Sequence, residues 1–192
     1  MYDDNNSDNT EIATLANGCF WCSEAIFKRL RGVKSVLPGY SGGIVKNPSY
    51  NQVCTGKTGH AESIQIEFDP KVIPFEKILD VFWHTHDPTT LNRQGNDVGT
   101  QYRSAIFYHN QKQEEIAENS KKRLEKDGVY RDSIVTEISP FRDFYVAEDY
   151  HKNYYENHKD APYCSFIIDP KVHKLLMKYG NEVKEEYVNS KH

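Results

Sequence analysis

The sequence lacks the features that would place a protein in a membrane or on nucleic acid. Its 192 residues contain no apolar run near the roughly 20 residues that a membrane-spanning helix needs. Basic residues number 24 and acidic residues 28, so the formal net charge is −4. Without a basic excess, electrostatics offer no attraction to nucleic acid or to an anionic membrane surface. We therefore expect neither as a partner.

A secretory signal and a disulfide framework are also lacking. Residues 2–9 are acidic and polar, whereas a signal peptide has a basic and then an apolar region. The 4 cysteines are too few for a disulfide-stapled scaffold in a chain of this length. These absences predict a cytoplasmic, reducing location. The chain length suits one domain with a sizeable core.

Strand and helix patterns alternate along the chain. Strands are predicted at 12–16, 32–38, 63–68, 104–108 and 134–139. Helices are predicted at 24–30, 74–84, 111–126, 147–156 and 169–187. Two long loops, 39–59 and 87–103, carry unusual polar residues without a periodic pattern. A loop of this length is either functional or contains an element that the pattern does not reveal. The alternation predicts an α/β protein with a mixed sheet and helices packed on it.

One cysteine lies where the first strand gives way to a helix. Cys19 follows the turn residues Asn17 and Gly18, near the N-terminus of the helix predicted at 24–30. Unpaired N–H groups and the positive end of the helix dipole stabilise a thiolate there. Cys22 follows three residues later, and Cys-x-x-Cys in an intracellular chain indicates redox chemistry or metal binding. A cysteine that only packs in the core is the plain alternative.

Further motifs in the two long loops accompany this cysteine. They are Gly39-Tyr40-Ser41-Gly42-Gly43, Asn47-Pro48-Ser49-Tyr50, Thr58-Gly59-His60-Ala61-Glu62, His86-Asp87-Pro88-Thr89 and the run from Gln94 to Ser104. Together with Gly18-Cys19-Phe20-Trp21, they resemble the A-type peptide methionine sulfoxide reductase family in order and spacing. The resemblance covers residues 11–165. One motif alone would be weak, whereas the ordered set is specific.

The resemblance implies a role for each matching residue. Cys19 is expected to attack the sulfoxide sulfur, and Glu62 to donate a proton to the sulfoxide oxygen. The supporting residues would be Tyr50 and Tyr102 as hydrogen-bond donors to that oxygen, Phe20 and Trp21 as the pocket for the substrate methyl group, and Asp97 as a supporting carboxylate. The chemistry agrees, because a sulfoxide is a poor electrophile until its oxygen is protonated, and burial beside aromatic rings keeps a carboxyl group protonated.

The resemblance also implies the fold, the substrate and the partner. The family core is a two-layer α/β plait, so we expect an α+β ferredoxin-like plait with long functional loops. The family reduces the S epimer of methionine sulfoxide, free or in peptides, and thioredoxin restores its thiols without a metal or an organic cofactor. We therefore expect a monomeric enzyme of oxidative damage repair. Residues 1–10 are predicted to form a flexible tail and residues 11–192 a single catalytic domain.

Two thiols are candidates to condense with a sulfenic acid on Cys19. The family usually has glycine where this chain has Cys22, which lies one helical turn from Cys19. Cys164 sits where the family often carries its first recycling cysteine. We favour Cys164 over Cys22, and a relay through both stays open. Cys54 is expected to pack without a required role.

Interpretations from other classes stay open at this point. Cys19-x-x-Cys22 with His84-x-His86 has spacings compatible with a tetrahedral zinc site. Cys-Phe-Trp-Cys after a strand also resembles the redox pair of a thioredoxin-like oxidoreductase. A module that only binds oxidised peptides would need an inert Cys19. Taken singly, Glu62 is compatible with a solvated loop acid and Asp97 with a residue that stabilises its own turn.

Overall fold

A computed structural model describes residues 9–188 of the chain. The residues that it describes form one six-stranded sheet in the order β7-β6-β1-β3-β2-β8 and a separate two-stranded hairpin, β4-β5. The bounds are β1 Glu11–Asn17, β2 Val33–Ser41, β3 Ala61–Phe68, β4 Arg93–Gln94, β5 Asp97–Val98, β6 Ser104–Tyr108, β7 Glu137–Pro140 and β8 Phe144–Val146. Only β6 and β7 pair in parallel, so the sheet is mixed.

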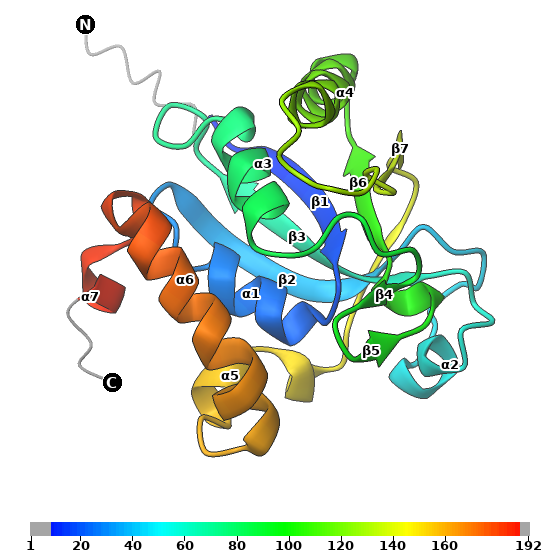
Figure 1. Cartoon of the computed structure of the whole chain (residues 1–192). Helices are drawn as coiled ribbons and strands as arrows, with labels where there is room; N and C mark the ends of the chain where they lie inside the picture. Colours follow the sequence, from blue (N-terminus) through cyan, green and yellow to red (C-terminus); the bar gives the residue numbers. More distant parts are fainter. Residues whose placement is uncertain (1–8, 189–192) are drawn as a thin grey trace, which may run out of the picture.

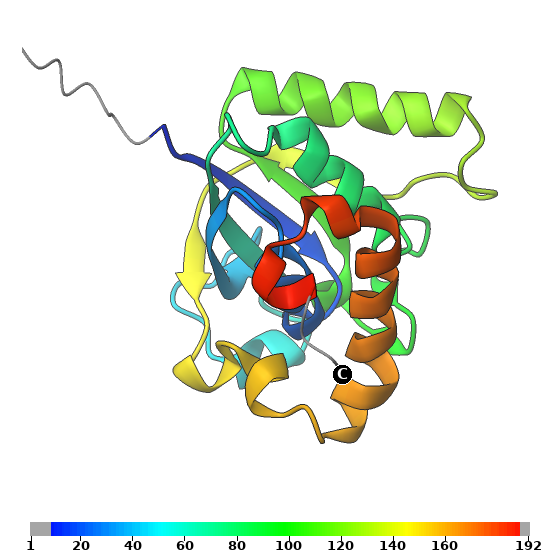
Figure 2. The same cartoon turned by 90° about the vertical axis from the view of Figure 1, so that its left-hand side faces the viewer.

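The helices are α1 Phe20–Phe27, α2 Tyr50–Cys54, α3 Phe75–His84, α4 Gln111–Lys126, α5 Tyr154–Asn157, α6 Asp169–Tyr179 and α7 Glu185–Val188. Short helical turns are η1 Thr100–Tyr102, η2 Asp149–His151, the π-helix η3 Cys164–Ile168, and η4 Gly180–Glu182. Helices α1, α3 and α6 lie on one face of the sheet, and α4 lies beside α3 (Figure 1). Figure 2 shows the same helical layer edge-on against the strands.

The core lies between the central strands and this helical layer. Strands β1 and β3 are antiparallel, with Leu15 opposite Ile64. Because side chains alternate across a strand, Ile64 and Ile66 share one face with Glu62. Both isoleucines are fully buried in the main apolar cluster. The register of β3 therefore directs the side chain of Glu62 into the interior and not into solvent.

Periodicity predicted most of these elements. The strands predicted at 12–16 and 104–108 are β1 and β6, and the helices predicted at 74–84 and 111–126 are α3 and α4 within one residue. Helix α3 buries Ile78, Leu79 and Phe82 on the predicted apolar face. None of the helices within residues 9–188 is both long and apolar enough to cross a membrane.

Three predicted helices have different bounds. The helix predicted at 24–30 begins earlier, at Phe20, because the turn at Gly18 ends β1 sharply. The helix predicted at 147–156 is broken into η2 and α5, since Asn153 takes a left-handed backbone with φ of 53°. The helix predicted at 169–187 begins at Asp169 but stops at Tyr179. The chain then becomes extended at Val183, which bridges Leu30.

Elements without an expected pattern lie mostly in the two long loops. The first loop contains α2, which begins with a capping box between Ser49 and Gln52. The second contains the hairpin β4-β5 and the turn η1. The strand predicted at 134–139 is shifted, because the N–H of Val135 bonds instead to the carbonyl oxygen of Pro88. The predicted tail at residues 1–10 lies almost wholly outside the described residues.

Candidate active site

The turn between β1 and α1 places Cys19 at the head of the helix. Gly18 has a φ of +96°, a backbone that glycine adopts without steric cost. A Cβ atom at this position would also lie 2.7 Å from Cγ of Gln94. The carbonyl oxygen of Cys19 accepts hydrogen bonds from the N–H groups of Cys22 and Ser23 over 3.1 and 3.3 Å. Cys19 is therefore the N-cap residue of α1.

The carboxyl group of Glu62 lies directly beside this turn. Glu62 is only 2% exposed, and the N–H of Phe20 donates to its Oε2 over 3.1 Å. Burial raises the pKa of Glu62 to about 8, and the charges of Asp97 and Cys22 act in the same direction. A protonated carboxylic acid therefore stands next to Cys19 at neutral pH.

The two thiols of α1 interact with each other. The hydrogen bond with Cys19 lowers the pKa of Cys22 to about 7, whereas burial raises the pKa of Cys19. The more acidic thiol of the pair is therefore Cys22, whereas at Cys19 burial outweighs the stabilisation of a thiolate that is expected at the head of a helix. Cys19 is 7% exposed and Cys22 2%, so Cys19 is the more accessible of the two. The pair thus offers a thiolate near neutral pH.

Two phenols complete the polar part of the site. Burial, and then the negative charge of Glu62, raises the pKa of Tyr50 and of Tyr102 far above the usual range. Both phenols therefore stay protonated and lie within electrostatic range of Glu62. Tyr50 comes from α2 and Tyr102 from η1, so the two long loops meet at this point.

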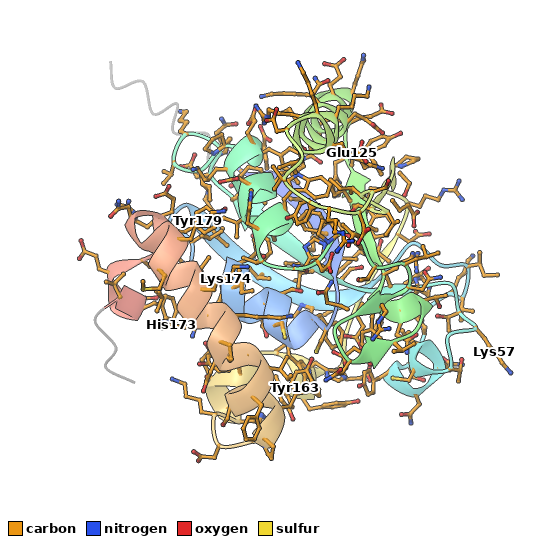
Figure 3. The ribbon with its side chains drawn as sticks, in the orientation of Figure 1. Lys57, Glu125, Tyr163, His173, Lys174 and Tyr179 are labelled. Atoms are coloured by element: carbon orange, nitrogen blue, oxygen red, sulfur yellow. The ribbon has the colours of Figure 1, made fainter. Side chains whose placement is uncertain are left out.

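Asp97 reaches the site through a residue that sequence analysis did not select. The hydroxyl group of Tyr163 donates to Oδ2 of Asp97 over 2.8 Å. The same hydroxyl lies 3.9 Å from Sγ of Cys22. Figure 3 shows Tyr163 between the C-terminal helices and the β4-β5 hairpin. Tyr163 therefore connects the carboxylate of the hairpin to the pair of thiols.

Aromatic rings form the apolar wall of the site. The ring of Tyr154 stacks on Trp21 with centroids 3.7 Å apart and an interplanar angle of 5°. The indole N–H of Trp21 donates to Nδ1 of His151 over 3.0 Å. The ring of Phe20 contacts His151 as well, at 4.9 Å between centroids. Trp21 is thus fixed both by stacking and by a hydrogen bond.

The remaining cysteines differ sharply in their surroundings. Cys164 is fully buried in an apolar cluster that also contains Cys19 and Cys22. Cys54 is exposed on α2, and all four cysteines are free thiols. The structure therefore gathers the three thiols that sequence analysis assigned to chemistry and leaves Cys54 apart from that cluster. Together with Glu62, such a site can attack an electrophilic atom and protonate an oxygen bound to it.

Known proteins match this chain over most of its length. The family model for peptide methionine sulfoxide reductase matches residues 11–184. A peptide methionine sulfoxide reductase MsrA of Sulfolobus acidocaldarius is 56% identical over 172 residues, which are 90% of this chain and 97% of the relative. The chain belongs to the peptide methionine sulfoxide reductase family.

Solved structures agree with this membership. The reduced form of Mxr1 from Saccharomyces cerevisiae has a TM-score of 0.73 at 35% identity, over 83% of this chain and 91% of Mxr1. Mxr1 in complex with Trx2 has a TM-score of 0.52 at 27% identity, over 78% of this chain and 87% of Mxr1. The methionine sulfoxide reductase fold therefore extends over most of the described residues.

Two residues that hold the aromatic wall, His151 and Tyr154, were not predicted from the sequence because they contact Trp21 across a long separation in the chain. His151 and Tyr154 lie within a segment whose aromatic residues were assigned to a helix. Their partner Trp21 is 130 residues away from His151 in the sequence. The signal available was the dense run of aromatic residues from Tyr150 to Tyr155, which periodicity alone did not interpret.

The geometry does not support the zinc interpretation. Both ring nitrogens of His86 have hydrogen-bond partners, the carbonyl oxygen of Phe82 and Oγ of Ser104. His84 instead contacts Asp80 on its own helix. Within residues 9–188, no three His, Cys, Asp or Glu side chains come together as metal ligands. A thioredoxin-like dithiol site would also leave the acid Glu62 beside Cys19 without a role.

Proposed function

We propose that this chain reduces methionine (S)-sulfoxide, free or in peptides and proteins, to methionine and so repairs oxidative damage. The observation that carries the proposal is the Glu62 carboxyl group buried beside Cys19, where burial raises its pKa to about 8. A sulfoxide accepts a nucleophile at sulfur only when its oxygen is protonated or strongly hydrogen-bonded. The site supplies both needs, a sulfur nucleophile and a proton donor.

In the first step, Cys19 attacks the sulfoxide sulfur while Glu62 protonates the oxygen. The attack forms an S–S bond between Cys19 and the substrate. The protonated oxygen then passes to the Cys19 sulfur while this S–S bond and the substrate S–O bond break, so Cys19 becomes a sulfenic acid and methionine leaves. The substrate sulfur gains the two electrons that the Cys19 sulfur loses. Tyr50 and Tyr102 act as further hydrogen-bond donors to the developing negative charge on oxygen. Their raised pKa values keep both hydroxyl groups protonated for this purpose.

The aromatic wall is proposed to bind the substrate methyl group. Phe20 and Trp21 follow Cys19 directly, and both rings contact His151. His151 and Tyr154 keep the indole ring of Trp21 in one orientation. Asp97 supports the site by holding the hydroxyl group of Tyr163 near the thiols.

A second thiol then condenses with the sulfenic acid to form a disulfide. Cys22 and Cys164 both lie in the apolar cluster of Cys19 and are the candidates. The disulfide must be reduced by an external dithiol, and we propose thioredoxin in this role. The relative Mxr1 has been solved in complex with Trx2, which supports the assignment.

We further propose that the sheet is a ferredoxin-like plait inside a single catalytic domain. Four antiparallel neighbours in the order β6-β1-β3-β2 support this, with α1 following β1 and α3 following β3 in the chain. The family match at residues 11–184 agrees with a domain at 11–192. Four free thiols are consistent with a reducing, cytoplasmic location.

The test is single-turnover reduction of a methionine sulfoxide peptide without added reductant. The wild-type chain should release one equivalent of methionine peptide, and Cys19→Ser should release none, because serine is too weak a nucleophile in this position. Cys54→Ser, which removes the exposed thiol, should retain the wild-type yield. Substantial turnover by Cys19→Ser would contradict the assigned nucleophile.

A further inference from the structure

Three buried thiols meet at a site whose proposed reaction needs two. Cys19 and Cys22 occupy the first turn of α1, where the N–H of Cys22 donates to the carbonyl oxygen of Cys19 over 3.1 Å. Residues three apart in a helical turn have Cα atoms about 5 Å apart. This lies inside the range of Cα separations found in disulfides, about 4.4–6.8 Å. The expected Cα separation of the pair is therefore compatible with a disulfide.

The two thiols lie in one buried apolar cluster. Each thiol shifts the pKa of the other, so the two groups are within interaction range. The hydroxyl group of Tyr163 lies 3.9 Å from Sγ of Cys22. When Cys19 carries the sulfenic acid, Cys22 is thus the thiol nearest to it along the chain, and it lies in the same buried cluster.

Cys164 lies on a separate element, and the residues next to it are held by hydrogen bonds. It is fully buried at the start of η3. The preceding residue, Tyr163, is fixed by its hydrogen bond to Asp97 of the β4-β5 hairpin over 2.8 Å. The backbone after Cys164 is held as well, since the N–H of Ser165 bonds to the carbonyl oxygen of Ala161. An attack by Cys164 on Cys19 would start from this anchored segment, whereas Cys22 lies on the helix that Cys19 caps.

Resting on the proposed function, we propose that Cys22, and not Cys164, is the thiol that resolves the sulfenic acid of Cys19. The sulfur of Cys22 donates an electron pair to the sulfur of Cys19, and an S–S bond forms. The S–O bond of the sulfenic acid breaks, and the leaving hydroxide takes the thiol proton of Cys22 to become water. Cys164 remains a thiol during this step, and thioredoxin-type dithiols reduce the Cys19–Cys22 disulfide.

The direct test needs no mutation. The wild-type chain is mixed with one equivalent of a methionine sulfoxide peptide without reductant, quenched early with acid and alkylated. The peptide that carries Cys19 and Cys22 should be two hydrogens lighter and unalkylated, while Cys164 and Cys54 should be alkylated. A Cys19–Cys164 disulfide as the first product would overturn the proposal.

Variants separate resolution from the first step. In Cys22→Ser, dimedone should trap the sulfenic acid on Cys19 in most molecules, with resolution slowed at least tenfold. Cys164→Ser and the control Cys54→Ser should resolve at the wild-type rate and give little trapped acid. Wild-type resolution in Cys22→Ser, or trapped acid in Cys164→Ser, would reject Cys22. If the wild-type chain releases no methionine at all, the proposed function fails and the resolving thiol is not at issue.

Discussion

The proposed reacting groups Cys19 and Glu62 and the residues that hold the aromatic wall, His151 and Tyr154, stand on different scaffolds. Cys19 and Glu62 come from the ends of β1 and β3, which pair in the middle of the sheet. The wall residues His151 and Tyr154 come from short helices outside the sheet. Backbone pairing therefore positions the reacting groups, whereas side-chain contacts position the wall.

The short helices that carry His151 and Tyr154, here called the second scaffold, are held by hydrogen bonds of nearby carboxylates. Both carboxylate oxygens of Glu24 accept the N–H of Asn153 at 3.0 Å, which fixes the turn before Tyr154. Glu148 accepts the hydroxyl group of Tyr40 over 3.1 Å and the N–H of Tyr50 over 3.2 Å. Single substitutions can thus loosen the wall without moving the sheet. Changes in the first scaffold should alter the rate of chemistry, and changes in the second should alter substrate binding.

The largest expected effect is a slower chemical step when Glu62, the acid on strand β3, is replaced. Glu62→Gln keeps the shape but removes the proton donor, so single-turnover methionine release should slow by about 10²-fold or more. Glu67→Gln on the same strand is the matched control, because Glu67 is exposed and bonds to Ser35. Equal rates for Glu62→Gln and the wild-type chain would remove Glu62 from the chemistry.

The second effect is the pH dependence of the same step. Below about pH 7 the Cys19–Cys22 pair is protonated, and above about pH 8 Glu62 is ionised, so the rate should fall on both sides. Each limb should approach a tenfold change per pH unit, since one proton is lost or gained. Stopped-flow or quenched single turnovers from pH 5 to 10 measure the profile. Glu62→Gln should lose the alkaline limb, and an alkaline limb that persists would assign it to another group.

The third effect is a weaker binding of substrate when a contact of the aromatic wall is removed. His151→Phe keeps a ring beside Phe20 but removes the acceptor of the Trp21 indole N–H. A lost hydrogen bond of about 1 kcal/mol corresponds to an approximately fivefold rise in KM. kcat should change less than KM, whereas a general folding defect would lower the active fraction and leave KM unchanged. His173→Phe, at an exposed position on α6, is the control.

The smallest expected effect is on stability and follows from the same carboxyl group. The pKa of Glu62 is raised to about 8 from its ordinary value of 4.5. The folded state therefore binds the proton more tightly than the unfolded state does. The resulting contribution to the free energy of unfolding is fully present below pH 4.5 and is lost as the pH rises to 8. The glutamine side chain of Glu62→Gln cannot ionise, so the Tm of this variant should exceed that of the wild-type chain by a few degrees at pH 8, and less at pH 5. A difference in Tm that does not grow with pH would show that Glu62 is not held protonated in the fold.

Local patterns were sufficient for much of the fold. Helical periodicity predicted α3 and α4 because each buries one side of the helix. Short apolar runs predicted β1 and β6, whose strands are buried on both faces. It failed where side-chain contacts override local preference. Residues 147–156 have a helical pattern, but the bonds of Glu24 to Asn153 hold the chain in a left-handed turn there.

The sequence by itself determined which chemical groups are present and that Cys19 lies near the start of a helix. Gly18 and Cys19 follow from the turn and the helix start, and the ordered motifs select Glu62, Tyr50 and Tyr102. Only the tertiary structure decided the state of those groups. The pKa of Glu62 depends on its burial on the inner face of β3 and on charges from Asp97 and Cys22. Tyr163 and His151 join the site from distant segments, and contacts at such separations leave no periodic trace in a single chain.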